Sequence, residues 1–155
     1  MQEIKKILCP IAGTEESNRV LDSASMMALR FGAQLTVLNV APLKIIHLMS
    51  EHGHLVEEEQ DLLPQQVQER LELRSGEVLA RAGEHLAGID AEFKRVIGHP
   101  GSVICDFAKE EGFDLIVVGN RKHNPLQGMV LGSVSDHVVQ HSPCPVLVVG
   151  HHNAR

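Results

Sequence analysis

Short aliphatic runs alternate along the chain with longer segments in which apolar residues recur every three or four positions. Five runs predict strands, at residues 4–11, 34–40, 90–97, 114–118 and 145–149. One-sided apolar periodicity predicts helices over about 15–31, 65–87, 102–111 and 132–141. Strands that alternate with helices indicate a parallel sheet with right-handed crossovers. We therefore expect an α/β fold: a single-domain, open, twisted, five-stranded parallel sheet with helices on both faces, over residues 1–150, and a short tail at 151–155.

The patterns also predict which side chains are buried. The first helix should turn one face inward, made of Val20, Leu21, Ala24, Met27, Ala28 and Phe31. The last helix should do the same with Val134, Val138 and Val139. The run at 114–118 is almost purely aliphatic, which is typical of a strand buried on both faces. The more polar run at 90–97 suits a strand at the edge of the sheet.

The pattern weakens between the second strand and the helix that begins at Gln65. Residues 42–64 are expected to form a mobile insertion, because long segments without periodicity inside a domain are usually functional or disordered. The acidic run at 57–61 within it has two readings. In the simpler reading the acidic run is a solvated loop. In the other reading it is a docking segment for an unknown protein partner.

Composition excludes several classes of protein. The formal net charge of −6 argues against a nucleic-acid partner, because binding to phosphate backbones needs an excess of Lys and Arg. Aromatic residues make up only 3% of the chain, too few for base-stacking surfaces. No apolar segment approaches the roughly 20 residues that cross a bilayer, so no membrane association is expected. Three widely spaced cysteines without a secretory leader predict a reducing, cytoplasmic location.

Two predicted strands end in glycine, at Gly13 and Gly119, and a helix begins at Gly132-Ser133. In open parallel sheets, ligands bind beyond the carboxyl ends of the strands, where the winding direction reverses. If the first and fourth strands are neighbours, the free N–H groups of helix 132–141 face the same crevice and suit a phosphate. By itself Gly132-Ser133 is also an ordinary helix start, so the spacing from Gly119 carries the phosphate hypothesis.

Neither catalysis nor a metal site is expected. The ten histidines form no four-ligand cluster with the tight spacing of structural zinc sites, and the pair His137 and His141 provides only two ligands. Cys9 and Cys144 fall in strand patterns, where free thiols are usually small buried apolar groups. No nucleophile elbow and no Gly-x4-Gly-Lys-(Ser/Thr) phosphate loop is present. A slow ATPase is the one activity left open.

Several motifs together resemble the universal stress protein family. The family pattern Gly-x2-Gly-x9-Gly-(Ser/Thr) is matched here by Gly119-x2-Lys122-x9-Gly132-Ser133. The ending Ser142-Pro-Cys-Pro-Val-Leu-Val-Val149 matches in full. The opening at 6–17, the strand Thr36-Val-Leu-Asn-Val40 and the Gly98-x-Pro100 turn are also similar. The resemblance covers nearly the whole chain.

The resemblance implies a Rossmann-like fold of the adenine nucleotide alpha hydrolase type, a homodimer paired through strand 145–149, and ATP or AMP as a ligand, with Mg²⁺. On this resemblance we expect adenosine against Pro10, Ile11, Ala12 and Val40. The phosphates are expected near Gly119, Arg121, Lys122, Gly132, Ser133 and Ser135, with Val118 and Val134 as further nucleotide-binding candidates. The chain departs from the family pattern twice. Ala12 stands where nucleotide-binding members carry Asp, and Lys122 stands where the second glycine is expected.

The two departures leave two hypotheses about function. The first is a stress-response protein that binds an adenine nucleotide without turnover, with Arg121 and Lys122 compensating for the lost Asp. Loss of that charged acceptor costs about 1.5–3 kcal/mol, roughly ten- to hundredfold in affinity. The alternative is a dimeric interaction module of the same family that has lost nucleotide binding and recognises a protein partner through residues 42–64.

Overall fold

The computed structural model describes residues 2–42, 65–120, 122–124, 128–130 and 132–150. The predicted insertion and the tail lie outside these residues, except that Pro42 belongs to a strand. The elements, in chain order, are β1 (Lys6–Ile11), α1 (Ser17–Phe31), β2 (Gln34–Pro42), α3 (Gln65–His85), β3 (Ala91–Gly98), α4 (Pro100–Glu111), β4 (Leu115–Gly119), β5 (Lys122–Asn124), β6 (Gly128–Val130), α5 (Ser133–His141) and β7 (Val146–Val149).

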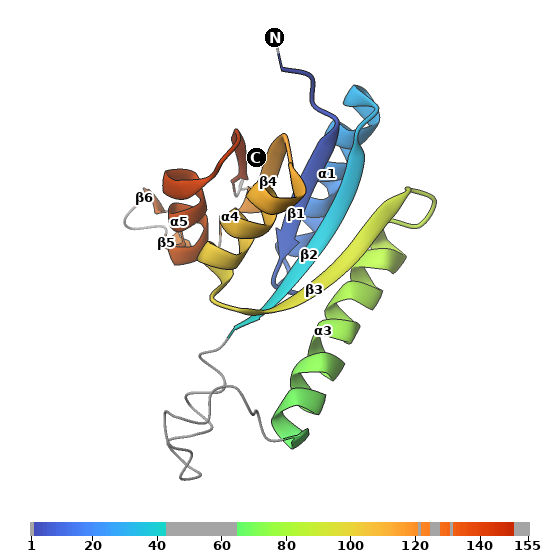
Figure 1. Cartoon of the computed structure of the whole chain (residues 1–155), viewed down its shortest axis with the longest axis vertical. Coiled ribbons are helices and arrows are strands. Elements are labelled where there is room, and N and C mark those ends of the chain that lie inside the picture. Colours follow the sequence, from blue (N-terminus) through green and yellow to red (C-terminus); the bar gives the residue numbers. More distant parts are fainter. Residues whose placement is uncertain (1, 43–64, 121, 125–127, 131, 151–155) are drawn as a thin grey trace.

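The described strands form one five-stranded parallel sheet in the order β3-β2-β1-β4-β7 (Figure 1). The predicted fold class is confirmed. Strands β2 and β3 add to one side of β1, and the chain then crosses back to place β4 on its other side, where Ile7 pairs with Leu115. The winding direction thus reverses between β1 and β4, which is where open α/β sheets bind ligands.

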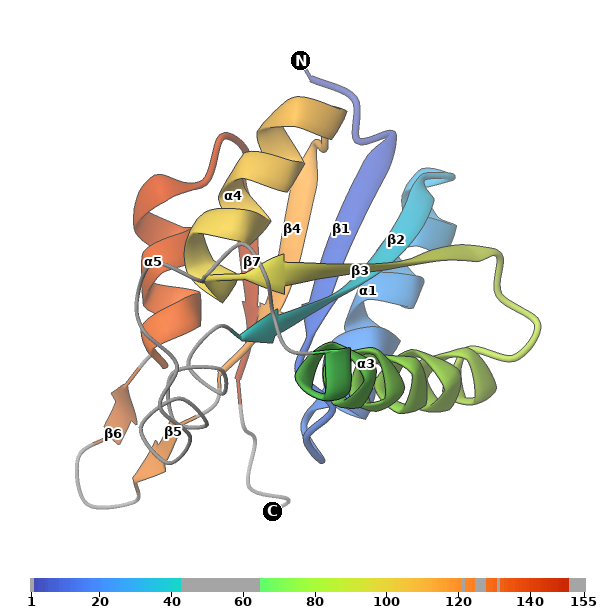
Figure 2. The same ribbon diagram turned by 60° about the horizontal axis from the view of Figure 1, so that its bottom comes forward.

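Among the described helices, α1 and α3 lie on one face of the sheet and α4 and α5 lie on the other (Figures 1 and 2). On one face, α1 and α3 bury residues such as Leu21 and Ala82 against the alternate side chains of β1, β2 and β4. On the other face, α4 and α5 bury Ile104 and Val138 against the intervening side chains of the same strands. The central strands are therefore apolar on both faces, as predicted for residues 114–118.

The edge strands and the helix ends follow from local sequence. Strand β3 is at one edge of the sheet, as predicted, and most of its residues are exposed. Helix α1 ends at Gly32, whose φ of 62° is left-handed and favours glycine. The predicted turn at 98–101 is shorter than expected, because α4 already begins at Pro100, and proline suits the first position of a helix.

Two predicted inward side chains are exposed. Phe31 is 48% exposed, because it is the last residue of α1, where the chain leaves the sheet. Val139 is 45% exposed, because it follows the fully buried Val138 and successive helical residues point about 100° apart. Apolar character alone did not distinguish the two faces of these helices.

No strand was predicted between Gly119 and Gly132, yet this segment contains two short strands. Strands β5 and β6 pair in antiparallel fashion, with Lys122 opposite Val130 and Asn124 opposite Gly128. Strands of three residues are too short to show alternation, so sequence patterns did not reveal them. No helix in the described ranges is both long and apolar enough to cross a membrane.

Candidate functional site

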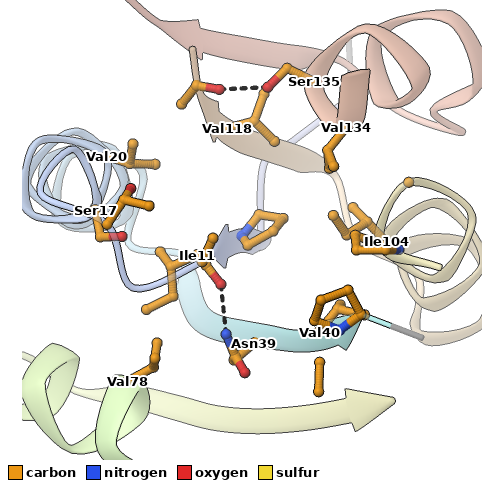
Figure 3. Close-up of a pocket in the computed structure, with 18 of the residues that line it drawn as sticks. Ile11, Ser17, Val20, Asn39, Val40, Val78, Ile104, Val118, Val134 and Ser135 are labelled. Carbon is orange, nitrogen blue, oxygen red and sulfur yellow. Dashed lines mark hydrogen bonds between the residues drawn. The ribbon is translucent and has the colours of Figure 1, made fainter. Parts of the chain in front are cut away.

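A cavity of about 640 Å³ lies at the carboxyl ends of β1, β2 and β4 (Figure 3). Its walls come from the start of α1, the middle of α3, and the first turns of α4 and α5. The crevice predicted from the glycine-terminated strands is therefore present. A volume in this range is typical of pockets that enclose small molecules.

The first turn of α5 forms one wall of the cavity. Ser133, Val134 and Ser135 line it, and Gly132 precedes them as the N-cap residue. The amide of Asp136 donates to the carbonyl of Gly132 at 2.8 Å, which starts the helical pattern. The earlier N–H groups of a helix have no partner within it, and no side-chain hydrogen bond caps this end. This turn can therefore bind an anion through N–H donors and the helix dipole.

Gly119, at the end of β4, joins this wall to α1. The hydroxyl of Ser135 donates to the carbonyl of Gly119 at 2.5 Å, which holds the helix against the strand end (Figure 3). A Cβ atom on Gly119 would lie 2.7 Å from Cγ2 of Val20, closer than side chains approach. The close contact with α1 therefore favours glycine at position 119 for a steric reason, apart from any ligand.

The end of β1 is held by a buried polar chain. The side-chain amide of Asn39 donates to the carbonyl of Ile11 at 3.0 Å, and the hydroxyl of Ser75 donates to Oδ1 of Asn39 at 2.7 Å. Asn39 and Ser75 are only 6% and 4% exposed, and both line the cavity. The chain links β1, β2 and α3. Neither residue was predicted as part of the site, although a polar residue within the aliphatic run of β2 was an available signal for Asn39.

Nine of the twelve site residues predicted from sequence line this one cavity: Pro10, Ile11, Ala12, Val40, Val118, Gly119, Ser133, Val134 and Ser135. Gly132 is described as the N-cap of α5 and is not among the lining residues. Arg121 lies outside the described residues, and Lys122 is placed in β5 by its backbone alone. Ala12 is exposed and lines the cavity.

The walls from α3 and α4 were not predicted. Helix α3 contributes Leu71, Arg74, Ser75 and Val78, and the start of α4 contributes residues 99–102 and Ile104. Gly101 in α4 packs against His137 of α5, since a Cβ there would lie 2.8 Å from the imidazole Cγ. Helix α3 is far from β1 and β4 in sequence. Helix α4 directly precedes β4, but its first turn reaches the site only because the folded chain packs it against α5.

The sequence matches the model of the universal stress protein family over residues 3–150. The chain belongs to this family. It is 35% identical to the universal stress protein YxiE of Bacillus subtilis over 146 residues, which cover 93% of this chain and 97% of that protein.

Solved universal stress proteins share the fold. One, in complex with cAMP, aligns with a TM-score of 0.63 at 23% identity, covering 96% of this chain and 98% of the other. Another, from Archaeoglobus fulgidus and in complex with dAMP, aligns with a TM-score of 0.57 at 22% identity, covering 96% of this chain and 98% of that one.

The thiols of this universal stress protein are poorly suited to nucleophilic chemistry. Burial raises the pKa of Cys9 to about 12. Burial also raises the pKa of Cys105 and of Cys144, although a hydrogen bond between the side chains of Ser142 and Cys144 partly opposes this at Cys144. A thiolate, the reactive form, is therefore disfavoured at all three sites.

The described histidines do not assemble a metal centre. The rings of His137 and His141 stack with their centroids 4.2 Å apart, and Nδ1 of His141 lies 3.0 Å from the carbonyl of His137. Across the described ranges, no group of three or more potential ligands among His, Cys, Asp and Glu lies close enough to hold an ion. His137 is better understood as part of the cavity wall, packed against Gly101.

Proposed function

We propose that this member of the universal stress protein family binds an adenine nucleotide, ATP or AMP, and acts in the stress response through binding rather than turnover. The observation that carries the proposal is the first turn of α5, which has no side-chain cap and opens into a cavity at the switch between β1 and β4. A helix N-terminus at such a switch point favours a phosphate group.

The rest of the cavity suits a nucleoside. Apolar surface comes from Pro10, Val40 and Ile104, which line the same cavity as the first turn of α5. Figure 3 shows Val40 and Ile104. A base can bury its faces against such surface and make hydrogen bonds with backbone groups at the strand ends. Two structural relatives are described as complexes with cAMP and with dAMP, which supports an adenine nucleotide as the ligand class.

The proposed binding mode must work without a carboxylate at the end of β1, where Ala12 stands. The backbone donors of α5 then carry most of the affinity, with Mg²⁺ accompanying ATP and with Arg121 and Lys122 as the nearby cations of the sequence. Pairing of two copies through β7 belongs to the same proposal, since β7 is an edge strand whose four residues are only half-buried.

The test is to unfold the purified protein, analyse any released nucleotide by chromatography, and titrate the stripped, refolded protein with Mg-ATP and AMP by calorimetry. The informative variant is Ser133→Glu. Ser133 is exposed at the first position of α5, where a carboxylate suits the helix dipole and should not destabilise the fold. The same carboxylate repels phosphates, so we expect affinity to fall by about tenfold or more.

Val139→Glu is the matched control, because it adds the same charge to the outer face of the same helix. It should leave affinity within about twofold of the parent. Equal weakening by both substitutions would place the phosphates elsewhere. Absence of released nucleotide together with absence of binding heat would refute the proposal and favour the nucleotide-independent interaction module.

A further inference from the structure

Arg74 is a charged residue of the cavity wall that the proposed binding mode does not use. It lines the cavity from α3, and its side chain is exposed. Within the described ranges, no hydrogen bond or ion pair holds its guanidinium. Among the described residues that line the cavity, Arg74 is the only Lys or Arg, and Glu16 is the only Asp or Glu. A permanent positive charge in the wall of a ligand cavity favours an anionic group on the ligand.

Helix α3 packs against the end of β1 on both sides of Ala12. Before Ala12, the strand end is bound by Asn39, which accepts the hydroxyl hydrogen of Ser75 on α3 at 2.7 Å. After Ala12, a Cβ atom on Gly13 would lie 2.5 Å from Cγ2 of Val78, which is also on α3. Ala12 itself is exposed and lines the cavity. The surface around Ala12 is therefore shared between β1 and α3.

Arg74 lies on the ligand side of these contacts. It precedes Val78 by about one helical turn, or about 6 Å along the helix axis. Helix α3 ends before β3, which starts beside the start of β2, where Ala91 pairs with Leu35. The helix therefore runs from the carboxyl ends of the strands toward their amino ends. Arg74 is thus nearer than Val78 to the edge where the strands end, and it lines the cavity there together with Ala12.

Arg74 and the first turn of α5 belong to opposite walls of the cavity. Helix α5 is held to β4 by the hydrogen bond from Ser135 to Gly119, whereas α3 is held to β2. Strand β1 separates β2 from β4, which puts those two strands about 10 Å apart at the usual spacing. Figure 3 shows Val78 and Ser135 on opposite sides of Ile11. A phosphate bound at α5 therefore leaves Arg74 to a different group of the ligand.

The acidic residue of the cavity lies toward the other side of the sheet. Glu16 also lines a small crevice with Arg19, Asn120 and Val149, and Val149 belongs to β7. In the sheet, β4 and β7 are on one side of β1, and β2 is on the other. The negative charge of Glu16 and the positive charge of Arg74 are therefore on different sides of the cavity.

The residues around the end of β1 suit a ribose that carries a phosphate. In the proposed function, adenosine lies at this strand end and its 5′-phosphates lie at α5, so the ribose is beside Ala12. In dinucleotide-binding α/β proteins, a carboxylate binds the hydroxyl groups of an unmodified ribose, whereas an arginine accommodates a ribose phosphate. Here the strand end carries a methyl group, and the adjacent helix supplies a guanidinium.

We propose that the preferred ligand is an adenine nucleotide phosphorylated on its ribose, at the 2′ or 3′ oxygen, as well as at the 5′ oxygen, and that Arg74 binds the ribose phosphate. This inference rests on the proposed function, because it takes the first turn of α5 as the site of the 5′-phosphate. A guanidinium donates two parallel hydrogen bonds to a phosphate, which gives such a contact both strength and direction.

The experiment compares isomers by calorimetry on the full chain. ADP, adenosine 2′,5′-bisphosphate and adenosine 3′,5′-bisphosphate carry equal numbers of phosphates in different places, so the comparison largely removes the effect of total charge. We expect at least one bisphosphate to bind about tenfold or more tighter than ADP, because it gains a charge-assisted contact with Arg74.

Three variants locate the source of that preference. Arg74→Ala should abolish it by weakening the bisphosphate more than ADP. Arg81→Ala is the matched control, because Arg81 is an exposed residue of α3 that does not line the cavity, and the preference should persist. Ala12→Asp should also abolish the preference, because it places a carboxylate beside the ribose phosphate. Thermal unfolding of each variant shows that it is folded.

The outcomes separate this inference from the proposed function. Equal affinity of the parent for ADP and both bisphosphates would overturn the inference and leave the proposed function standing. A preference that survives either Arg74→Ala or Ala12→Asp would also overturn it. Equal weakening of all three ligands by Arg74→Ala would do the same, because the guanidinium would then contact a group that they share. Absence of binding by AMP and by all three isomers would refute both proposals.

Discussion

At the end of β1, the polar groups that face the cavity are paired with each other, whereas at the start of α5 the helix end carries no side-chain cap. We call the first region the closed corner (Ile11, Asn39 and Ser75) and the second the open corner (Gly119 and residues 132–135). In the closed corner, two hydrogen bonds of 3.0 and 2.7 Å join three elements. In the open corner, Ser135 binds Gly119, and the backbone donors of the helix turn face the cavity.

The comparison separates two uses of polar groups at one site. Buried polar groups that are satisfied internally fix the shape of a cavity, because leaving them unpaired is costly. Donors at a helix end can instead be satisfied by a ligand. We therefore expect changes in the closed corner to alter the free energy of unfolding more than ligand binding, and changes in the open corner to do both.

The largest expected effect on stability is that of Asn39→Leu. The substitution removes two hydrogen bonds and leaves the carbonyl of Ile11 and the hydroxyl of Ser75 without their partner. Each unsatisfied buried group costs about 1–3 kcal/mol, so we expect a loss of roughly 3 kcal/mol in the free energy of unfolding, measured with urea. Ser75→Ala breaks only one of the bonds and should cost about 1 kcal/mol. Equal losses in the free energy of unfolding for the two variants would show that the hydrogen bond from Asn39 to Ile11 adds nothing to stability beyond the one from Ser75 to Asn39.

Gly119→Val tests the open corner and should cost about 2 kcal/mol, which is typical of an overpacked side chain. The new Cβ would meet Cγ2 of Val20 at 2.7 Å, so β4 and α1 must separate slightly. Because Gly119 also holds Ser135, the same variant should weaken ATP binding in calorimetry. Gly112→Ala is no suitable control, since Gly112 has a φ of 69° and alanine is strained there. Gly76→Ala is a better control: Gly76 is an exposed residue of α3, where a methyl group meets no other atom within 4 Å, so ATP binding should stay intact.

The smallest effect at neutral pH concerns Cys9, in the dry core beneath the closed corner. Burial raises its pKa from 9.0 to about 12 in the folded protein. Below pH 9 the thiol is protonated in both states. Between pH 9 and about 12 the unfolded chain loses this proton first, so the free energy of unfolding should fall as pH rises.

The variant Cys9→Ala isolates that contribution, because it lacks the titrating thiol. The variant should be less stable than the parent, but above pH 9 its free energy of unfolding should fall less steeply as pH rises. Urea unfolding at several pH values gives both slopes. Parallel slopes for the parent and the variant would mean that water reaches the thiol, and that the core under the closed corner is less dry than its burial implies.

Much of the fold could be predicted, because its determinants are local. Aliphatic runs of strand length, glycine at the end of α1 and proline at the start of α4 each act through neighbouring residues. The parallel sheet followed from their alternation, and β3 was correctly placed at an edge by its polar sequence. Phe31 and Val139 were wrongly predicted to point inward. Which face of a helix is buried depends on its packing against the sheet, and the apolar character of single residues does not determine it.

The candidate site divides in the same way. The sequence by itself determined which strand ends carry glycine and where α5 begins, since close backbone approach and helix initiation depend on a few adjacent residues. Only the tertiary structure placed Asn39, Ser75 and Arg74 on the same cavity, because α3 reaches β1 through packing across the sheet and leaves no local pattern.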